Sequence, residues 1–124
     1  KPQDEQDAFS ILQKLRNREH QVITGIAVID AQGEQVSIDA AVTTVKMRDY
    51  SDSEIKASIA SGHAMDKAGA YAIQDTQFNF ISAFDGCPSN VVGLPLCRIT
   101  RLLERQGTRT RSIEQRRSED NCSL

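Results

Sequence analysis

The side chains most suited to binding a ligand or catalysing a reaction are gathered in residues 62–74, GHAMDKAGAYAIQ. Asp66 and Lys67 are adjacent there, and the small residues Ala-Gly-Ala follow them, so no bulky side chain screens the two charges from a ligand. A lysine ammonium suits phosphate oxygens, an aspartate can hold a metal or a water, and the amide of Gln74 both donates and accepts hydrogen bonds. The residues alone predict a phosphate or nucleotide site in this loop.

The simpler interpretation of Asp66 and Lys67 is a surface ion pair, which contributes little to stability. The neighbouring residues favour a site instead. A predicted helix ends at Gly62, directly before the loop, and Gln74 lies within a short reach of the two charges. We therefore keep the ion pair as the alternative and predict the site.

Cysteine and histidine chemistry is not favoured elsewhere in the chain. Cys87, Cys97 and Cys122 are odd in number and lack CxxC spacing, so they predict neither a disulfide framework nor a zinc site. His20 and His63 are not spaced as metal ligands, and we interpret both as polar surface or strand-end residues. This cysteine usage fits a reducing compartment, so we predict a cytoplasmic location.

The bulk properties of the chain restrict its class. A chain of 124 residues has the length of one domain, and its hydrophobic and charged fractions of 39% and 26% are those of a globular protein. A net charge of −2 argues against a nucleic-acid partner bound through a broad basic face. No apolar run reaches membrane-spanning length, so no membrane partner is predicted.

Two helices are expected before the loop. The first covers residues 4–18, where apolar residues recur at helical spacing on one face: Ala8, Ile11, Leu12 and Leu15. The second begins at a capping box made of Ser51 and Glu54 and ends at Gly62, a residue type common at helix C-termini. This second helix delivers the chain to the loop.

Two strands are expected between these helices. Residues 20–30 are apolar on both alternating faces, which predicts a central strand in a covered sheet. Gly25 in its middle predicts close packing, with an approaching ligand as the alternative. A turn at residues 30–33 then returns an antiparallel strand over about residues 34–47. Its apolar pattern changes phase at Thr43 and Thr44, which predicts a β-bulge.

The chain after the loop predicts a second hairpin and a last helix. Residues 78–84 form the first strand, Val91 and Val92 form the return strand, and the helix begins near Pro95 and ends at Gly107. Residues 108–124 are charged and poor in apolar side chains, so we predict a disordered tail, with an arm for a partner or nucleic acid as the alternative. Residues 1–107 are thus expected to form one α/β (mixed α+β) domain.

Several stretches together resemble the Maf family of nucleoside triphosphate pyrophosphatases. They are Lys1-Pro2 with the following helix, HQVITGIAV at residues 20–28, Thr44-Val45, DKAGAYAIQ at residues 66–74 and NVVGLPL at residues 90–96. Their order and spacing match the family over about residues 1–104. The resemblance implies a mixed sheet flanked by helices, of the Maf and inosine-triphosphatase type, and a homodimer.

The resemblance also implies a reaction, namely hydrolysis of a nucleoside triphosphate to the monophosphate and pyrophosphate with a divalent cation, Mg or Mn. Carried over by motif, Lys1 resembles the family's phosphate-contacting lysine, and Asp66 and Lys67 resemble the charged pair of its pocket. We predict these three residues as catalytic, and Gln74 as the residue near the base that sets specificity. KAGAYAIQ resembles the branch of the family that acts on dTTP and UTP; non-standard nucleotides are further candidate substrates.

The chain departs from the family pattern in three places. The Ser-Pro-Arg-Arg motif and the Asp-Thr motif, whose Asp is the family's usual catalytic base, have no counterpart, so we expect a chain truncated just after them. Asp75 stands where the family usually has glycine, and Cys87-Pro88-Ser89 replaces a commonly aromatic turn. The alternative function is a non-catalytic nucleotide-binding or division-related regulatory module.

Overall fold

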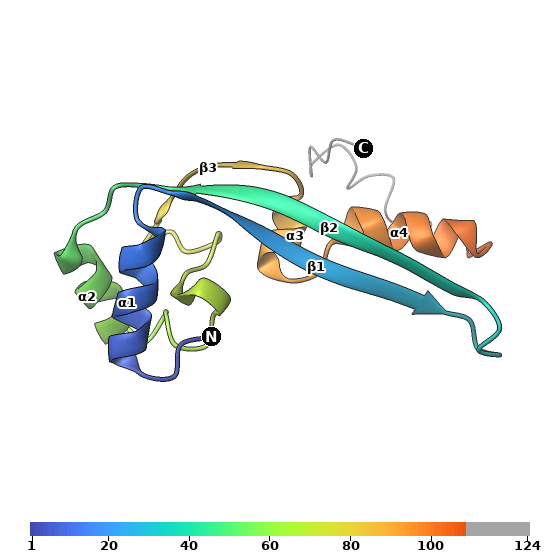
Figure 1. The fold of residues 1–124 in the computed structure, drawn as a ribbon, viewed down its shortest axis with the longest axis horizontal. Coiled ribbons are helices and arrows are strands. Elements are labelled where there is room, and N and C mark those ends of the chain that lie inside the picture. Colours follow the sequence, from blue (N-terminus) through green and yellow to red (C-terminus); the bar gives the residue numbers. More distant parts are fainter. Residues whose placement is uncertain (109–124) are drawn as a thin grey trace. The chain divides into compact units, whose positions relative to one another are not determined.

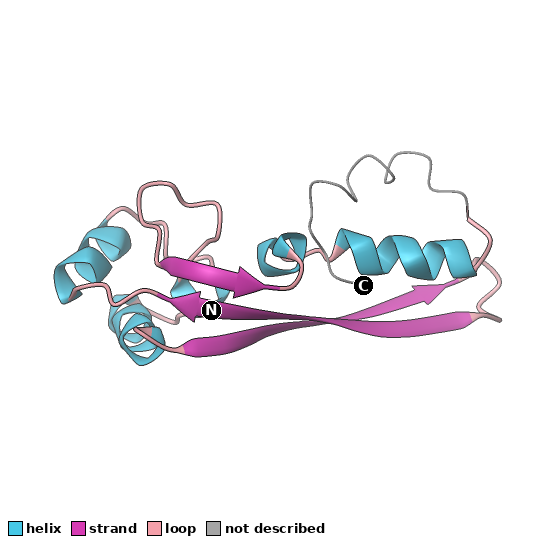
Figure 2. Ribbon diagram, turned by 90° about the horizontal axis from the view of Figure 1, so that it is seen from above, coloured by secondary structure: helices cyan, strands magenta, loops and turns pink. Residues whose placement is uncertain are grey.

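Helices flank an antiparallel sheet in the computed structural model, which describes residues 1–108 (Figure 1). The elements follow in the order α1 (Glu5–Leu15), β1 (Glu19–Ile29), β2 (Val36–Met47), α2 (Asp52–Ala60), the 3₁₀ helix η1 (Ala68–Ala70), β3 (Ile81–Asp85), α3 (Pro88–Val92) and α4 (Leu96–Arg105). The strands are ordered β1-β2-β3 (Figure 2). The predicted class, a mixed α/β fold with a sheet flanked by helices, is confirmed.

The contacts of the chain divide it into two compact units. The first unit contains Lys1–His20 and Val45–Phe84, and the second contains residues 21–44 together with residues 85–108. The strands β1 and β2 contribute residues to both units. The prediction of one domain over residues 1–107 stays a prediction. The predicted tail, apart from Thr108, lies outside the described residues.

The first unit is built around α1, which packs against α2 and η1. Asp4 caps α1 by accepting a hydrogen bond from the backbone N–H of Asp7 at 2.7 Å, and Leu12 is fully buried. The Tyr50 hydroxyl donates to the Leu12 carbonyl at 2.6 Å, and its ring lies 4.5 Å from that of Phe80. Burial raises the pKa of Tyr50 to about 12, so the hydroxyl stays a donor at neutral pH. The helix predicted over residues 4–18 is confirmed, with a shorter C-terminal end.

The capping box of α2 is confirmed in both directions. The Ser51 hydroxyl accepts from the Glu54 backbone N–H at 3.2 Å, and the Glu54 carboxylate accepts from the Ser51 backbone N–H at 2.7 Å. Gly62 follows the helix with φ of +81°, a conformation that favours glycine. The helix is therefore defined at both ends and fixes where the loop begins.

The second unit is joined by a buried polar contact between α3 and the β1–β2 hairpin. Asn90 is fully buried, and its Nδ2 donates to the Val22 carbonyl and to Thr43 Oγ1, each at 3.0 Å. Farther along the hairpin, Gln106, directly after α4, donates to the Val28 carbonyl at 3.0 Å. The NVVGLPL motif thus provides a structural contact through its asparagine.

The prediction of a covered, central strand at residues 20–30 is wrong for the described part of the chain. β1 lies at an edge of the sheet, and the side chains of Ile23 and Ile29 are 64% and 61% exposed. The sequence is apolar on both alternating sets of residues, but the side chains of one set are half-buried and those of the other are exposed. The close packing predicted at Gly25 is also wrong, because a Cβ there would meet no atom within 4 Å.

Two further strand predictions are corrected. Burial alternates without interruption from Val36 to Met47, so β2 shows no change of face and no bulge at Thr43 and Thr44. The apolar residues at the start of β2 simply point to the exposed face. Residues 91–92 belong to α3 rather than a return strand, because Pro88 at the first helical position is compatible with a helix start. The last predicted helix is confirmed as α4.

Cys87 and Cys97 belong to the second unit, whereas the loop of residues 62–74 belongs to the first. Cys87 Sγ lies 2.9 Å from Cys97 Sγ, a contact between thiols in the second unit, and Cys122 is outside the described residues. Within residues 1–108, no helix is both long and apolar enough to cross a membrane.

Candidate functional site

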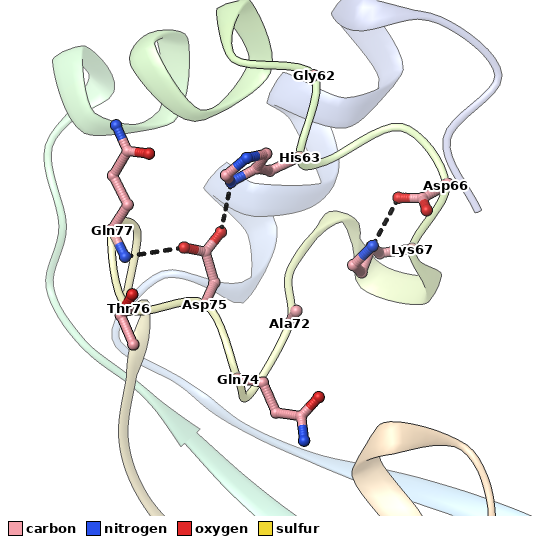
Figure 3. A pocket seen from close by; sticks show the side chains of 9 residues that line it. All are labelled: Gly62, His63, Asp66, Lys67, Ala72, Gln74, Asp75, Thr76 and Gln77. Atoms are coloured by element: carbon pink, nitrogen blue, oxygen red, sulfur yellow. Dashed lines mark hydrogen bonds and ion pairs between the residues drawn. The ribbon is translucent and has the colours of Figure 1, made fainter.

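A pocket of about 520 Å³ opens on the loop between α2 and β3, within the first unit (Figure 3). Three of the four residues predicted for the site, Asp66, Lys67 and Gln74, line it. The other lining residues are Gly62, His63, Ala72, Asp75, Thr76 and Gln77. The structure therefore brings together residues that the sequence spreads over 16 positions, counted inclusively from Gly62 to Gln77.

Asp66 and Lys67 form an ion pair at the pocket. Lys67 Nζ lies 2.8 Å from Asp66 Oδ1, and the Asp66 side chain is 74% exposed. The hydrogen bond from Lys67 lowers the pKa of Asp66, so this carboxylate is ionised at neutral pH. The pair presents an ammonium and a carboxylate to anything that enters the pocket.

Lys1, the fourth predicted residue, is exposed and is not among the residues that line the pocket. Its positive charge contributes, after that of Lys67, to lowering the pKa of Asp66. Lys1 therefore lies close enough to Asp66 for its positive charge to act on that carboxylate.

The loop is anchored through Tyr71, at the end of η1. The Tyr71 hydroxyl lies 2.8 Å from His20 Nε2, and its ring would meet a Cβ at Gly69 at 3.0 Å. Gly69 has φ of +72°, so this turn favours glycine both for its conformation and for its space. Burial lowers the pKa of His20 and raises that of Tyr71 to about 12, which keeps both groups neutral. His20 is thus a strand-end residue, as one of the two sequence interpretations had it, and its contact with Tyr71 positions the loop.

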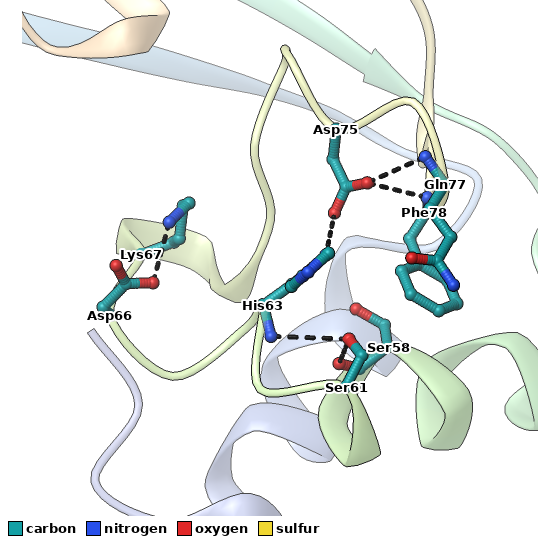
Figure 4. Close-up of polar contacts among 8 residues, drawn as sticks. All are labelled: Ser58, Ser61, His63, Asp66, Lys67, Asp75, Gln77 and Phe78. Atoms are coloured by element: carbon teal, nitrogen blue, oxygen red, sulfur yellow. Dashed lines mark hydrogen bonds and ion pairs between the residues drawn. The ribbon is translucent and has the colours of Figure 1, made fainter.

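His63 and Asp75 form a second polar contact at the pocket, which the sequence interpretation missed (Figure 4). His63 Nδ1 lies 3.0 Å from Asp75 Oδ2, while Asp75 Oδ1 accepts from the backbone N–H groups of Gln77 and Phe78 at 2.9 Å. The hydrogen bond from Phe78, followed by those from His63 and Gln77, lowers the pKa of Asp75. The one sequence feature that could have indicated this contact is Asp75, which stands where the family usually has glycine.

Gln74 is exposed at the pocket, and its amide has no hydrogen-bond partner within residues 1–108. Figure 3 shows its side chain pointing away from the His63–Asp75 contact. A free amide can donate and accept at once, as recognition of a nucleobase edge requires. The pocket thus combines charged groups with an amide that makes no hydrogen bond among the described residues.

The described residues do not form a metal site by themselves. No group of three or more His, Cys, Asp and Glu side chains within residues 1–108 is arranged to hold a metal ion. Asp66 and Asp75 at the pocket are already engaged with Lys67 and with His63 and backbone N–H groups, respectively. The acidic side chains of this loop therefore do not fit a protein-held divalent cation.

Comparison with known proteins finds a family match over nearly all the described residues. The family described as "Maf-like protein" matches residues 1–106. A protein of Syntrophomonas wolfei subsp. wolfei named dTTP/UTP pyrophosphatase is 46% identical over 108 residues, which make up 87% of this chain and 57% of that protein. A protein of the same name from Dictyoglomus turgidum is 48% identical over 107 residues, 86% of this chain and 55% of its own length.

A third relative extends the similarity to the end of the chain. A protein of Dehalococcoides mccartyi, also named dTTP/UTP pyrophosphatase, is 36% identical over 124 residues, 100% of this chain and 55% of its own length. The chain therefore spans about half the length of the curated relatives it matches.

Proposed function

Because this chain belongs to the family of Maf-like proteins, we propose that the protein to which it belongs is a nucleoside triphosphate pyrophosphatase. It hydrolyses dTTP or UTP to the monophosphate and pyrophosphate. The relatives' names support this choice of substrates. The observation that carries the proposal is that Asp66, Lys67 and Gln74 line one pocket.

In this proposal, some groups at the pocket contact the phosphates of a nucleotide and another contacts its base. Lys67 binds phosphate oxygens and stabilises the charge that develops on them during cleavage. Asp66 orients the Lys67 ammonium through their 2.8 Å contact. Lys1 adds positive charge close to Asp66, and the Gln74 amide contacts the base.

The remaining parts of the reaction are proposed from the family. A carboxylate that activates the attacking water lies in the portion of the full-length protein that the relatives have beyond the matched residues. The proposed cofactor is a divalent cation, Mg or Mn, which would neutralise phosphate charge. The acidic residues of the described loop do not hold it by themselves. We propose a cytoplasmic homodimer.

The test is an assay of the full-length protein for pyrophosphate release. We expect dTTP and UTP to be cleaved in the presence of magnesium or manganese, and faster than dATP, dGTP or CTP. Nucleoside monophosphate should appear in equal amount, because one anhydride bond breaks per turnover. Failure to cleave any nucleoside triphosphate would contradict the proposal, and tight nucleotide binding without turnover would identify a non-catalytic binding module instead.

Replacing Gln74 with glutamate should change the substrate preference. A glutamine amide can donate to a carbonyl of uracil or thymine and accept from the neighbouring N3–H, whereas a glutamate carboxylate can only accept. We expect kcat/KM for dTTP and UTP to fall by about ten- to a hundredfold, since a base oxygen loses its donor. We expect dGTP, with its adjacent N–H donors, to lose less.

The matched control is Gln77→Glu, which makes the same change of charge at another glutamine lining the pocket. The ratio of dTTP to dGTP cleavage should stay near that of the wild type in this control. Equal changes of the ratio in both variants would show that added charge, rather than loss of the Gln74 amide, sets the effect.

A further inference from the structure

We propose that His63 is a phosphate-binding residue of this pocket and that Asp75 is its positioning residue. The inference rests on the proposed nucleotide site and adds a residue to it. Neither position was predicted as part of the site from the sequence. The two residues lie 12 positions apart, and the fold brings them into contact at one pocket.

The imidazole of His63 is held from one side only. Nδ1 faces the Asp75 carboxylate at 3.0 Å, and the ring meets the Phe78 ring edge-on with centroids 5.9 Å apart. Its Nε2 has no hydrogen-bond partner within residues 1–108, and the side chain is 47% exposed. One ring nitrogen is therefore fixed by the protein while the other is available to a ligand.

Asp75 is well suited to fix that ring. Its side chain is only 11% exposed, and its other oxygen accepts two backbone N–H groups, from Gln77 and Phe78. These bonds hold the carboxylate in one orientation without using the oxygen that faces His63. Asp75 therefore orients the imidazole in the way that supporting carboxylates orient histidines at ligand sites.

A phosphate ligand needs the imidazolium form of His63, because only that form has a donor at Nε2 while Nδ1–H faces Asp75. The ionisable side chains that line the pocket are Asp66, Lys67, Asp75 and His63. With His63 neutral, these groups sum to −1, which disfavours an anion, and the ammonium of Lys67 is already paired with Asp66 at 2.8 Å. With His63 as the imidazolium these groups sum to zero, so the lining no longer opposes an anion. Nε2–H then donates to a phosphate oxygen.

The test measures equilibrium binding of three probes to the full-length protein by calorimetry: inorganic tripolyphosphate, dTTP and thymidine. For His63→Ala we expect about tenfold or weaker binding of tripolyphosphate and dTTP, the loss typical of a hydrogen bond between charged groups, with thymidine unaffected. Lys56→Ala is the matched control, because it removes a positive charge from the exposed surface of α2 without altering the pocket lining. It should change none of the three affinities.

A variant of Asp75 separates positioning of His63 from a purely structural role. Asp75→Asn, whose amide oxygen can still accept from the Gln77 and Phe78 N–H groups, should weaken tripolyphosphate binding several-fold at an unchanged melting temperature.

The outcomes decide between the two proposals. Wild-type affinity for tripolyphosphate in His63→Ala, or an equal loss of thymidine affinity, would overturn the role of His63 while leaving the pyrophosphatase intact. If His63→Ala loses affinity for tripolyphosphate and dTTP but not for thymidine, and the wild type cleaves no nucleotide, the role of His63 is supported and the proposed reaction is contradicted. A wild type that binds none of the three probes would overturn both.

Discussion

Replacing Lys67 with alanine is expected to reduce the kcat/KM for pyrophosphate release from dTTP by about a hundredfold or more, the loss typical when a group that stabilises transition-state charge is removed. Among the described residues, Lys67 supplies the one lysine ammonium that lines the pocket, and it lies 2.8 Å from Asp66 at the exposed rim. Its positive charge is therefore placed to interact with the phosphates rather than to hold the fold together.

The same substitution should leave the protein folded. An exposed ion pair contributes only about 0–1 kcal/mol to stability. The Lys67 side chain makes no cap for η1, which begins at the next residue. The melting temperature of Lys67→Ala should therefore stay close to that of the wild type.

Two controls define this result. Lys46→Ala removes an exposed lysine from β2, outside the pocket, and should retain wild-type kcat/KM. Lys67→Arg keeps the charge and should recover part of the activity, because a guanidinium also binds phosphate but with a different geometry. Near-normal activity in Lys67→Ala would contradict the catalytic role and favour the alternative interpretation, in which Asp66 and Lys67 form only a surface ion pair.

The second large effect is expected at Asn90. Replacing it with aspartate should lower the free energy of unfolding by about 3 kcal/mol or more at neutral pH, the cost of leaving a buried charge against unpaired acceptors. The Asn90 Nδ2 donates to the Val22 carbonyl and to Thr43 Oγ1, each at 3.0 Å. A carboxylate oxygen placed there has no proton to donate and faces the Val22 carbonyl oxygen directly.

The pH dependence of the Asn90→Asp variant has a defined sign. Burial raises the pKa of a carboxyl group in the folded state above its unfolded value of about 3.9. Relative to the wild type, the introduced carboxyl group therefore lowers the free energy of unfolding least at acid pH, where it is protonated in both the folded and the unfolded state. It lowers that free energy most at neutral pH, where the carboxyl group is charged in the unfolded state. We expect the difference in urea midpoints between Asn90→Asp and wild type to widen from pH 4 to pH 7.

The matched control is Asn79→Asp, at an asparagine outside the core. Asn79 uses its side-chain oxygen to accept from the Ile81 backbone N–H at 3.1 Å, which a carboxylate can also do. The urea midpoint of Asn79→Asp should stay close to that of the wild type. A similar midpoint for Asn90→Asp would show that the contact joining α3 to the hairpin contributes little.

The elements that local patterns define were predicted well from the sequence. The apolar spacing of Ala8 and Leu12 located α1, the Ser51–Glu54 capping box located the start of α2, and the residues after Pro95 located α4. Each signal lies within one or two helical turns, where neighbouring residues determine the backbone. The loop that these elements frame, with Asp66, Lys67 and Gln74, was identified for the same reason, since its composition is visible locally.

The tertiary structure decided what depends on contacts between distant residues. An apolar strand such as β1 does not itself show whether a second layer covers Ile23 and Ile29, because that depends on which elements pack against it. Likewise, His63 and Asp75 have no regular spacing that marks a pair, and only the path of the loop brings them to 3.0 Å. The sequence by itself therefore determined the helices, the family resemblance and the loop with its charges, because these are properties of neighbouring residues. The exposed sheet face and the full set of side chains at the pocket were determined by long-range packing.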